Sequence, residues 1–373
     1  MDAKDFKYIN NSEAKKVLSV NVDNISADDL LGFILLPEDK IEALVNLAAK
    51  IKEQYVGNTV YYRGLIEYSN ICAKNCLYCG IRACNDKVER YELNEDEVVN
   101  AARFAAEHHY ASIVIQSGER TDSNFTSKIA RLISKIHSET GNKLKITLSL
   151  GEQGEETYRL WRDCGAQRYL LRIESASEDL YRKLHPSDGK HSYKKRIEAI
   201  ENLRKLEYQV GSGVMIGLPF QTPQHLVNDL LFLKDFDIDM VGMGPYIEHH
   251  ETPLYEHRAL LLPKNERFLL GIKMVAALRI LMKDINIAAT TAMQALHPKG
   301  REMAIVAGAN VIMPNITPLK YRKDYLLYED KPCIDEDSEK CLKCLEKRIA
   351  TTGNQIGYDS WGDSKHFTNR KNS

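Results

Sequence analysis

The 373-residue chain lacks the features of a membrane protein and of a secreted protein. No apolar run approaches the roughly 18 residues that a membrane helix needs. The first ten residues, MDAKDFKYIN, are charged and contain no apolar core of the kind that a signal peptide carries. We therefore expect a cytoplasmic protein without a membrane-spanning segment.

An excess of charge of either sign is also lacking. Lysine and arginine number 51, aspartate and glutamate number 52, and the net charge is −1. Surfaces that bind polyanions usually carry an excess of positive charge, so neither nucleic acid nor an anionic membrane is an expected partner.

Cysteine is scarce, since eight residues are too few to cross-link a chain of this length as a disulfide scaffold. In a reducing compartment these thiols stay free to bind metal. The spacing of the cysteines is therefore more informative than their number.

Short apolar or β-branched runs alternate with amphipathic stretches along most of the chain. Eight such strand and helix units in roughly 260 residues predict an α/β fold, a complete (β/α)₈ barrel of the TIM type, with active-site residues at the carboxyl ends of the strands. The expected strands cover residues 59–69, 112–117, 145–150, 168–175, 209–219, 240–247, 286–293 and 310–314.

The barrel is expected to have an addition at each end. Helical periodicity over residues 12–55 predicts an N-terminal helical segment, which we bound at 1–55. The barrel is expected over 56–325. Residues 326–373 are polar, contain three cysteines near their start and form the predicted C-terminal extension.

Three cysteines, Cys72, Cys76 and Cys79, lie in one loop just after the first expected strand. A structural zinc site normally takes four protein ligands, whereas a cubane iron-sulfur cluster can leave one iron open. An open iron can bind the amino and carboxylate groups of S-adenosylmethionine, whose reduction releases a carbon radical. The alternative is a zinc site completed by Cys84.

A Cys-x₃-Cys-x₂-Cys loop with an aromatic residue before the last cysteine resembles the radical SAM superfamily. The resemblance implies that the three cysteines hold a [4Fe-4S] cluster and that Tyr78 lies beside the adenine of S-adenosylmethionine. Simple loop packing is the other interpretation of Tyr78. The run Gln116-Ser117-Gly118-Glu119 resembles the Gly-Gly-Glu element near the methionine amino group, with serine in place of the first glycine.

Longer runs resemble one branch of that superfamily, the HydE-type [FeFe]-hydrogenase maturases, over roughly residues 55 to 346. The resemblance implies an enzyme of H-cluster assembly that directs a 5′-deoxyadenosyl radical at the sulfur of a cysteine-bound iron carbonyl cyanide complex. It further implies HydG and HydF as partners and a low-potential electron donor such as flavodoxin or ferredoxin. The runs are 66–70, 116–119, 147–152, 168–172, 239–242, 289–293 and 310–315.

Charged residues recur at even spacing on the fourth expected strand, at Arg168, Arg172 and Glu174. Strand alternation points all three to one side, where buried charges need a partner or a ligand. The resemblance makes Glu174 and Arg196 partners of S-adenosylmethionine and assigns Arg168 and Arg172 to the substrate, because an arginine fork suits a carboxylate. An internal salt-bridge layer with Glu174 is the alternative.

Smaller and softer side chains are expected to complete the cavity. Hydroxyl groups orient a ligand without filling the space around it, and thioethers adapt to its shape. We expect catalytic or substrate-positioning hydroxyls at Thr147, Ser149, Thr290 and Thr291. The resemblance places Met240 and Met313 in the S-adenosylmethionine pocket, and Tyr321 and Tyr325 follow the last strand, where they could cap the cavity.

Two adjacent histidines, His249 and His250, follow the sixth expected strand. Neighbouring side chains in an extended segment point apart, so this pair predicts a loop feature rather than a metal site. The resemblance places His249 near the barrel mouth.

A second cysteine group, Cys333, Cys341 and Cys344, occurs in the polar extension. Because some HydE proteins carry an auxiliary cluster in this region, the resemblance permits a [2Fe-2S] or [4Fe-4S] centre. We predict a second cluster that is labile and not catalytic.

Two other functions fit the sequence. A relative of methylornithine synthase or biotin synthase would share the barrel and the N-terminal helices. An iron-sulfur carrier protein with two clusters would have no catalysis of its own, and would form no 5′-deoxyadenosine from S-adenosylmethionine.

Overall fold

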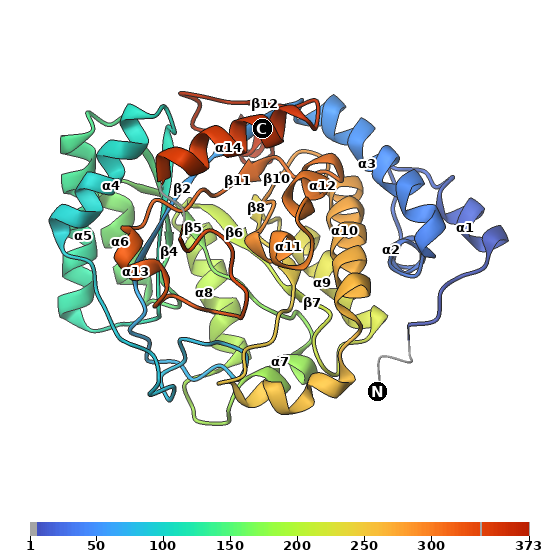
Figure 1. The fold of residues 1–373 in the computed structure, drawn as a ribbon, viewed down its shortest axis with the longest axis horizontal. Helices are drawn as coiled ribbons and strands as arrows, with labels where there is room; N and C mark the ends of the chain where they lie inside the picture. The colour runs from blue at the N-terminus through green and yellow to red at the C-terminus, as the bar shows by residue number, and fades with distance from the viewer. Residues whose placement is uncertain (1–5, 336–337, 373) are drawn as a thin grey trace.

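A curled parallel sheet forms the centre of the protein (Figure 1). The computed structural model describes residues 6–335 and 338–372, without the side chains of residues 338–341 and 343. Seven strands pair in the order β10-β8-β6-β5-β4-β3-β2. They are β2 (Gly64–Ser69), β3 (Ser112–Ser117), β4 (Lys145–Ser149), β5 (Ala166–Leu170), β6 (Gln209–Ser212), β8 (Met240–Val241) and β10 (Asn286–Ile287).

A further strand, β11 (Val311–Ile312), lies between the two edges of this sheet. It pairs with β1 (Thr59–Tyr62), which leads directly into β2, and parallel bridges join Leu65 to Asn315 and Ala288 to Val311. Short strands β7 (Met215–Ile216) and β9 (Gly244–Pro245) pair beyond the ends of β6 and β8. The predicted α/β fold with a parallel sheet of the TIM type is confirmed.

Helices cover the outer face of the sheet, and two of them, α4 and α9, begin at a capping box. Asn94 accepts a hydrogen bond from the backbone of Glu97, whose side chain reaches back to the cap, and Thr222 forms the same motif with His225. The covering helices are α4 (Glu95–Glu107), α5 (Ser123–Glu139), α6 (Glu155–Asp163), α8 (Tyr193–Lys205), α9 (Pro223–Asp235), α10 (Lys264–Leu281) and α12 (Gly300–Val306).

Shorter helices lie in the connections. They are α7 (Glu178–Leu184), α11 (Thr291–Leu296), α13 (Leu319–Arg322) and the 3₁₀ helices η2 (Glu38–Lys40) and η3 (Pro253–Leu260). Across residues 6–335 and 338–372, none of the helices combines the length and the apolar content that a membrane crossing requires.

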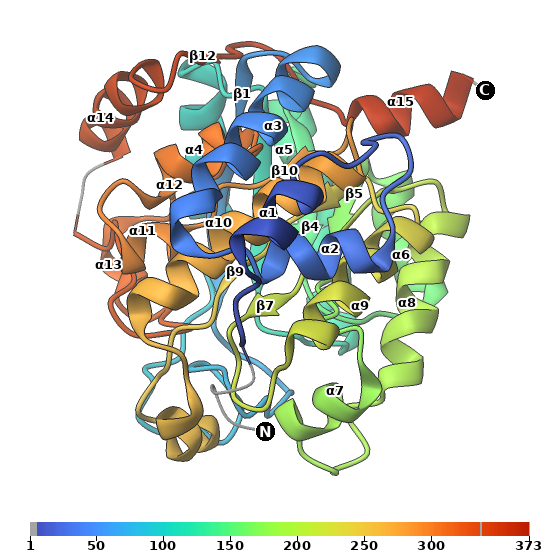
Figure 2. The ribbon, with the colours of Figure 1, turned by 90° about the vertical axis from the view of Figure 1, so that its right-hand side faces the viewer.

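The N-terminal segment packs against α10 and covers its outer side (Figure 2). It consists of α1 (Asn11–Val17), α2 (Ala27–Ile34) and α3 (Ile41–Tyr55). Because α10 lies between these helices and the sheet, every residue from 270 to 280 is buried, so the helix is not amphipathic as the sequence suggested. The buried Lys273 ammonium donates hydrogen bonds to the carbonyl groups of Ile34 (2.6 Å) and Leu36 (3.1 Å).

The end of the C-terminal extension closes the amino-terminal end of the barrel, whereas its first residues, 326–333, lie at the carboxyl ends of the strands. It contains α14 (Ser338–Ala350), β12 (Gln355–Ile356), which pairs with β1, and α15 (Lys365–Asn372). The carbonyl of Gly362 accepts hydrogen bonds from Arg63 (3.1 Å) and Asn286 (2.8 Å), which lie on either side of β11. The extension is therefore part of the packed fold, and the opposite end of the barrel is left as the mouth.

Candidate active site

A cavity of about 340 Å³ opens at the carboxyl ends of the strands. Its walls come from the loop after β2, the ends of β3, β4 and β5, the start of α11 and the segment 325–333. Parallel barrels place their active sites at this end, since the loops after the strands converge there.

The loop cysteines Cys72, Cys76 and Cys79 all line this cavity. The loop is fixed by its backbone, because the Ala73 amide donates a hydrogen bond to the Glu119 carbonyl (2.8 Å) and the Gly80 amide donates to the Leu327 carbonyl (3.0 Å). The three sulfurs therefore face the cavity from a loop whose two ends are tied to other segments.

The run 116–119 lies directly against the cysteine loop. The amide of Glu119 donates to the sulfur of Cys72 over 3.3 Å. Gly118 permits this approach, since a Cβ there would come within 2.4 Å of the Ile71 carbonyl oxygen and 2.7 Å of the Cys72 Cβ. Two segments that are distant in the sequence thus form one wall.

The surroundings of the three thiols suit a metal cluster. Burial raises the pKa of Cys76 to about 12 and also raises the pKa of Cys72 and of Cys79, so thiolates need a cation beside them. Among the described residues, His249, His250 and Glu329 form a group whose possible ligand atoms all lie within 4.8 Å of one another. The three sulfurs of the cysteine loop do not all lie that close together. Such separate thiols fit a cubane cluster better than a single zinc ion.

A buried network of four charges lies beside the cysteine loop. The Lys74 ammonium is 3.1 Å from a carboxylate oxygen of Glu119 and 3.0 Å from one of Glu152. Arg196 lies 2.7 Å from Glu152 and 3.8 Å from Glu119. Burial lowers the pKa of Arg196, but the charges of Glu152 and Glu119 outweigh it and hold this pKa well above its usual value. Arg196 therefore keeps its charge at neutral pH.

Arg172 and Glu174 form a second ion pair on the cavity wall, with 2.9 Å between nitrogen and oxygen. Glu174 has a φ of 66°, a left-handed conformation that is uncommon for this residue type. Its amide donates to the Gly213 carbonyl (3.0 Å), and its carbonyl accepts from Met215 (3.1 Å). These hydrogen bonds hold the backbone in the conformation that turns the carboxylate into the cavity.

Most of the residues predicted from the sequence line the cavity. Thr290 precedes α11 and Thr291 begins it, rather than ending a strand as expected. Besides the three cysteines, the lining includes Tyr78, Gln116, Ser117, Glu119, Ser149, Arg172, Glu174, Arg196, Thr290, Thr291 and Met313.

Arg168 does not reach the cavity. Its fully buried guanidinium donates to the Ser112 hydroxyl (2.7 Å), the Trp361 carbonyl (2.5 Å) and the Asp363 carboxylate (2.5 Å). Alternation gave the correct side of the strand, but Arg168 lies four residues before Arg172, or about 13 Å lower along the strand. Arg168 therefore belongs to an internal ion pair with the C-terminal extension.

Thr147 and Met240 lie in this lower layer too. Both residues line a small space of about 20 Å³ below the main cavity. Met313 lies between the two spaces and lines each of them. The Met240 sulfur accepts a hydrogen bond from Arg63 (2.9 Å). Met240 thus packs in the barrel interior instead of lining the cavity at the mouth.

Tyr321 lies outside the cavity. Its hydroxyl donates to Glu97 of α4 (3.1 Å), and its ring stacks on Tyr91 with 4.7 Å between centroids. Tyr325 and Tyr328 line the cavity instead, because the chain turns inward after α13. The sequence pattern placed these tyrosines after the last strand but gave no signal of which one faces inward.

Several charged residues of the cavity were missed. Glu67 and Lys331 form a buried ion pair with 2.5 Å between oxygen and nitrogen. Arg301 donates to the Cys333 sulfur (3.2 Å), and its buried Nε has no hydrogen-bond partner among the described residues. Lys74, between two cluster cysteines, could have been suspected from its position. No local pattern indicated Arg301.

The second cysteine group is only partly described. Cys333 lines the cavity next to Arg301, and Cys344 is exposed on α14. The side chain of Cys341 lies outside the described residues.

Comparison with known proteins agrees with this site. Residues 66–233 match the radical SAM superfamily. The "[FeFe] hydrogenase maturase subunit HydE" of Thermotoga maritima is 46% identical over 324 residues, which are 87% of this chain and 89% of that protein. Two solved structures share the fold. Methylornithine synthase has a TM-score of 0.77, 23% identity and coverage of 93% of this chain and 98% of its own. HydG, a maturase of the [FeFe]-hydrogenase, has a TM-score of 0.78, 19% identity and coverage of 99% and 82%. The chain therefore belongs to the HydE family of [FeFe]-hydrogenase maturases, within the radical SAM superfamily.

Proposed function

We propose that this enzyme acts on a cysteine-ligated iron carbonyl cyanide complex during assembly of the [FeFe]-hydrogenase H-cluster. The observation that carries the proposal is the cavity itself, in which a three-cysteine loop faces buried arginines in a chain 46% identical to HydE. The methylornithine synthase alternative has weaker support, at 24% sequence identity and, for the solved structure, 23% identity.

The residues around the cysteine loop fit a [4Fe-4S] cluster and S-adenosylmethionine. Cys72, Cys76 and Cys79 would hold the cluster, and Glu119 would receive the methionine amino group. When bound, the cluster supplies the electron that cleaves S-adenosylmethionine to methionine and a 5′-deoxyadenosyl radical. Further S-adenosylmethionine contacts are assigned to Tyr78, Gln116, Ser117, Glu174, Arg196 and Met313.

Arginines on the far wall suit the carboxylate of a cysteine ligand. Arg172 holds one carboxylate already, that of Glu174, and still faces the cavity. Arg301 offers an unpaired buried N–H. Ser149, Thr290 and Thr291 add hydroxyl groups that can orient the complex, so that its sulfur meets the radical.

HydG and HydF are the proposed partners, and the proposed electron donor is flavodoxin or ferredoxin. We assign the enzyme to the cytoplasm, because free thiols and a reducible cluster require a reducing compartment.

Arg172→Lys tests the function. A lysine keeps the charge but loses the fork, so we expect KM for the iron-cysteine complex to rise about tenfold to hundredfold, with kcat less affected. The measurement uses anaerobically reconstituted enzyme, S-adenosylmethionine and dithionite, with and without the complex. Arg159→Lys, on the exposed face of α6, is the control.

Three outcomes separate the possibilities. Adenosyl transfer to the complex with a raised KM in the Arg172 variant supports the proposal. Cleavage of S-adenosylmethionine without conversion of the complex contradicts the proposed substrate. No cleavage of S-adenosylmethionine at all, with or without the complex, favours the carrier protein.

An auxiliary cluster at Cys333, Cys341 and Cys344 is a separate part of the proposal. Its support is the cysteine spacing and the position of Cys333 in the cavity wall. We expect the double variant Cys341→Ser/Cys344→Ser to lose about two to four iron atoms per chain, as a [2Fe-2S] or [4Fe-4S] centre would, and to keep S-adenosylmethionine cleavage. Unchanged iron and sulfide contents would contradict a second cluster.

A further inference from the structure

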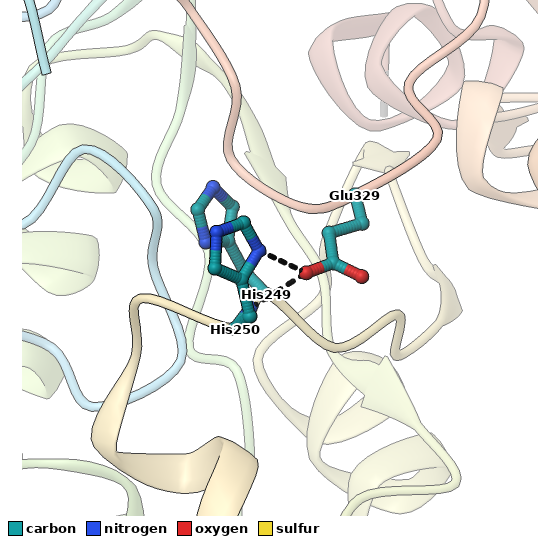
Figure 3. Close-up of side chains that lie close together, drawn as sticks. All are labelled: His249, His250 and Glu329. Carbon is teal, nitrogen blue, oxygen red and sulfur yellow. Dashed lines mark hydrogen bonds and ion pairs between the residues drawn. The ribbon is translucent and has the colours of Figure 1, made fainter. Parts of the chain in front are cut away.

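Two histidines and a glutamate meet at the barrel mouth, outside the cavity (Figure 3). One ring nitrogen each of His249 and His250 and one carboxylate oxygen of Glu329 lie within 4.8 Å of one another. The expectation that the two histidines point apart is wrong. The chain turns at His250 instead of continuing extended, and the rings stack with 5.2 Å between centroids and 16° between planes.

The hydrogen bonds of His250 call for a cation. Its Nδ1 contacts the Glu329 carboxylate, while its Nε2 lies 3.1 Å from an oxygen of Glu251. A neutral imidazole has one ring proton and can donate to only one of these carboxylates. The contact between Nδ1 and Glu329 is direct, and the same carboxylate oxygen accepts a hydrogen bond from the His250 amide at 2.8 Å, so a metal ion would replace the contact with Nδ1.

The contact between His250 Nε2 and Glu251 is of the kind that orients metal-bound imidazoles in other proteins. Such a ring usually donates its other N–H to a carboxylate, which fixes the tautomer. Glu251 occupies that position and is itself held by the Lys87 ammonium at 2.8 Å. A proton on Nε2 leaves the Nδ1 lone pair facing the Glu329 carboxylate, where a cation could replace the direct contact.

His249 is held in place by its surroundings. Its ring packs on Gly80, where a Cβ would come within 2.5 Å of the ring Cδ2 and 2.7 Å of Nε2. Its carbonyl accepts hydrogen bonds from the amide (3.0 Å) and the hydroxyl (2.6 Å) of Thr252. The Nδ1 of this buried ring accepts a hydrogen bond from the Glu251 amide over 3.2 Å, and a metal ion at Nδ1 would take the place of that donor.

Glu329 differs from the acidic residues near it in its ion pairs. Glu248 pairs with Arg267 at 2.8 Å, Asp330 lies 3.6 Å from Lys264, and Glu251 pairs with Lys87. Among the described residues, the ion pair of Glu329 is with His250. Its carboxylate thus has no lysine or arginine to compete with a metal ion.

We propose that His249, His250 and Glu329 bind one divalent transition-metal ion, which fastens the segment 325–333 to the barrel mouth. Two imidazoles and a carboxylate suit zinc or iron(II), with a water in the remaining position. Glu329 belongs to the same segment as Tyr328, Lys331 and Cys333, which line the cavity, so the ion fixes one wall of it. This site is independent of the cluster and of the proposed reaction.

The test is zinc binding to the anaerobic, cluster-loaded, full-length enzyme. Zinc chloride is added, unbound metal is removed by gel filtration, and bound zinc and iron are counted by mass spectrometry. We compare the wild type with His250→Gln and Glu329→Gln. His109→Gln is the matched control, since His109 is an exposed histidine paired with Asp359 at 2.9 Å, away from the cluster.

We expect the wild type and His109→Gln to bind about one more zinc ion per chain than the other two variants, with equal iron in all four. Zinc-edge X-ray absorption should show nitrogen or oxygen ligands at about 2.0–2.1 Å. Equal zinc in all four proteins would overturn the site. A sulfur shell at about 2.3 Å for that ion would also overturn it, by assigning the zinc to cysteines.

Hydrogen exchange of residues 325–333 tests the fastening. Zinc should slow exchange there several-fold in the wild type and in His109→Gln, and leave His250→Gln and Glu329→Gln unchanged. Binding without a change in exchange would overturn the role of the ion as a fastener. Because neither readout involves S-adenosylmethionine, failure here is distinct from failure of the proposed function.

Discussion

Cys76→Ser is expected to abolish cluster binding at the barrel mouth and to lower S-adenosylmethionine cleavage by about three orders of magnitude or more. A serine hydroxyl is a poor ligand for iron in place of a thiolate, and the change leaves the loop with two of its three thiols, Cys72 and Cys79. Iron and sulfide per chain, with 5′-deoxyadenosine formed under dithionite, are the measurements.

Cys84→Ser is the matched control, because Cys84 is exposed and only five residues beyond Cys79. It should keep its iron and its cleavage activity. If Cys84 completed a zinc site, both serine variants would lose metal equally. That result, or full activity in Cys76→Ser, would contradict a three-cysteine cluster.

Arg168→Met is expected to lower the free energy of unfolding by about 3 kcal/mol without changing KM for the substrate. The change leaves the Ser112 hydroxyl and the Trp361 carbonyl without their charged donor and removes the link to Asp363. Methionine keeps the apolar stem, so the loss reports on hydrogen bonds rather than on volume. Anaerobic urea unfolding followed by circular dichroism measures the change.

Arg159→Met, at an exposed pair with Glu155, should change stability by no more than about 0.5 kcal/mol. A stable Arg168→Met enzyme with a strongly raised KM would show that Arg168 binds substrate after all. Unfolding at lower urea with unchanged KM is the expected pattern.

The spacing of residues along the sequence predicted those parts of the site whose residues lie close together in the chain. The cysteine loop and the run 116–119 follow consecutive strands, and the ends of parallel strands meet in a barrel. Alternation also placed Arg172 and Glu174 together, although β5 ends at Leu170 and the left-handed backbone of Glu174 is what turns its carboxylate inward. All of these residues line the cavity.

The layer of the barrel in which a side chain lies, counted along the barrel axis, could not be predicted in the same way. Alternation gives the side of a strand but not the layer, and the partner of Arg168 is 195 residues away at Asp363. The burial of α10 on all sides likewise depends on helices more than 200 residues earlier. His249 and His250 face together because of a turn that no glycine or proline marks.

The last residues of the chain complete a structure that its first strand begins. Gln355 pairs with Thr59, and Gly362 bonds to Arg63, so these links span about 300 residues. Loop closure over that length costs entropy before these contacts give any gain, so we expect the floor of the barrel to close late in folding.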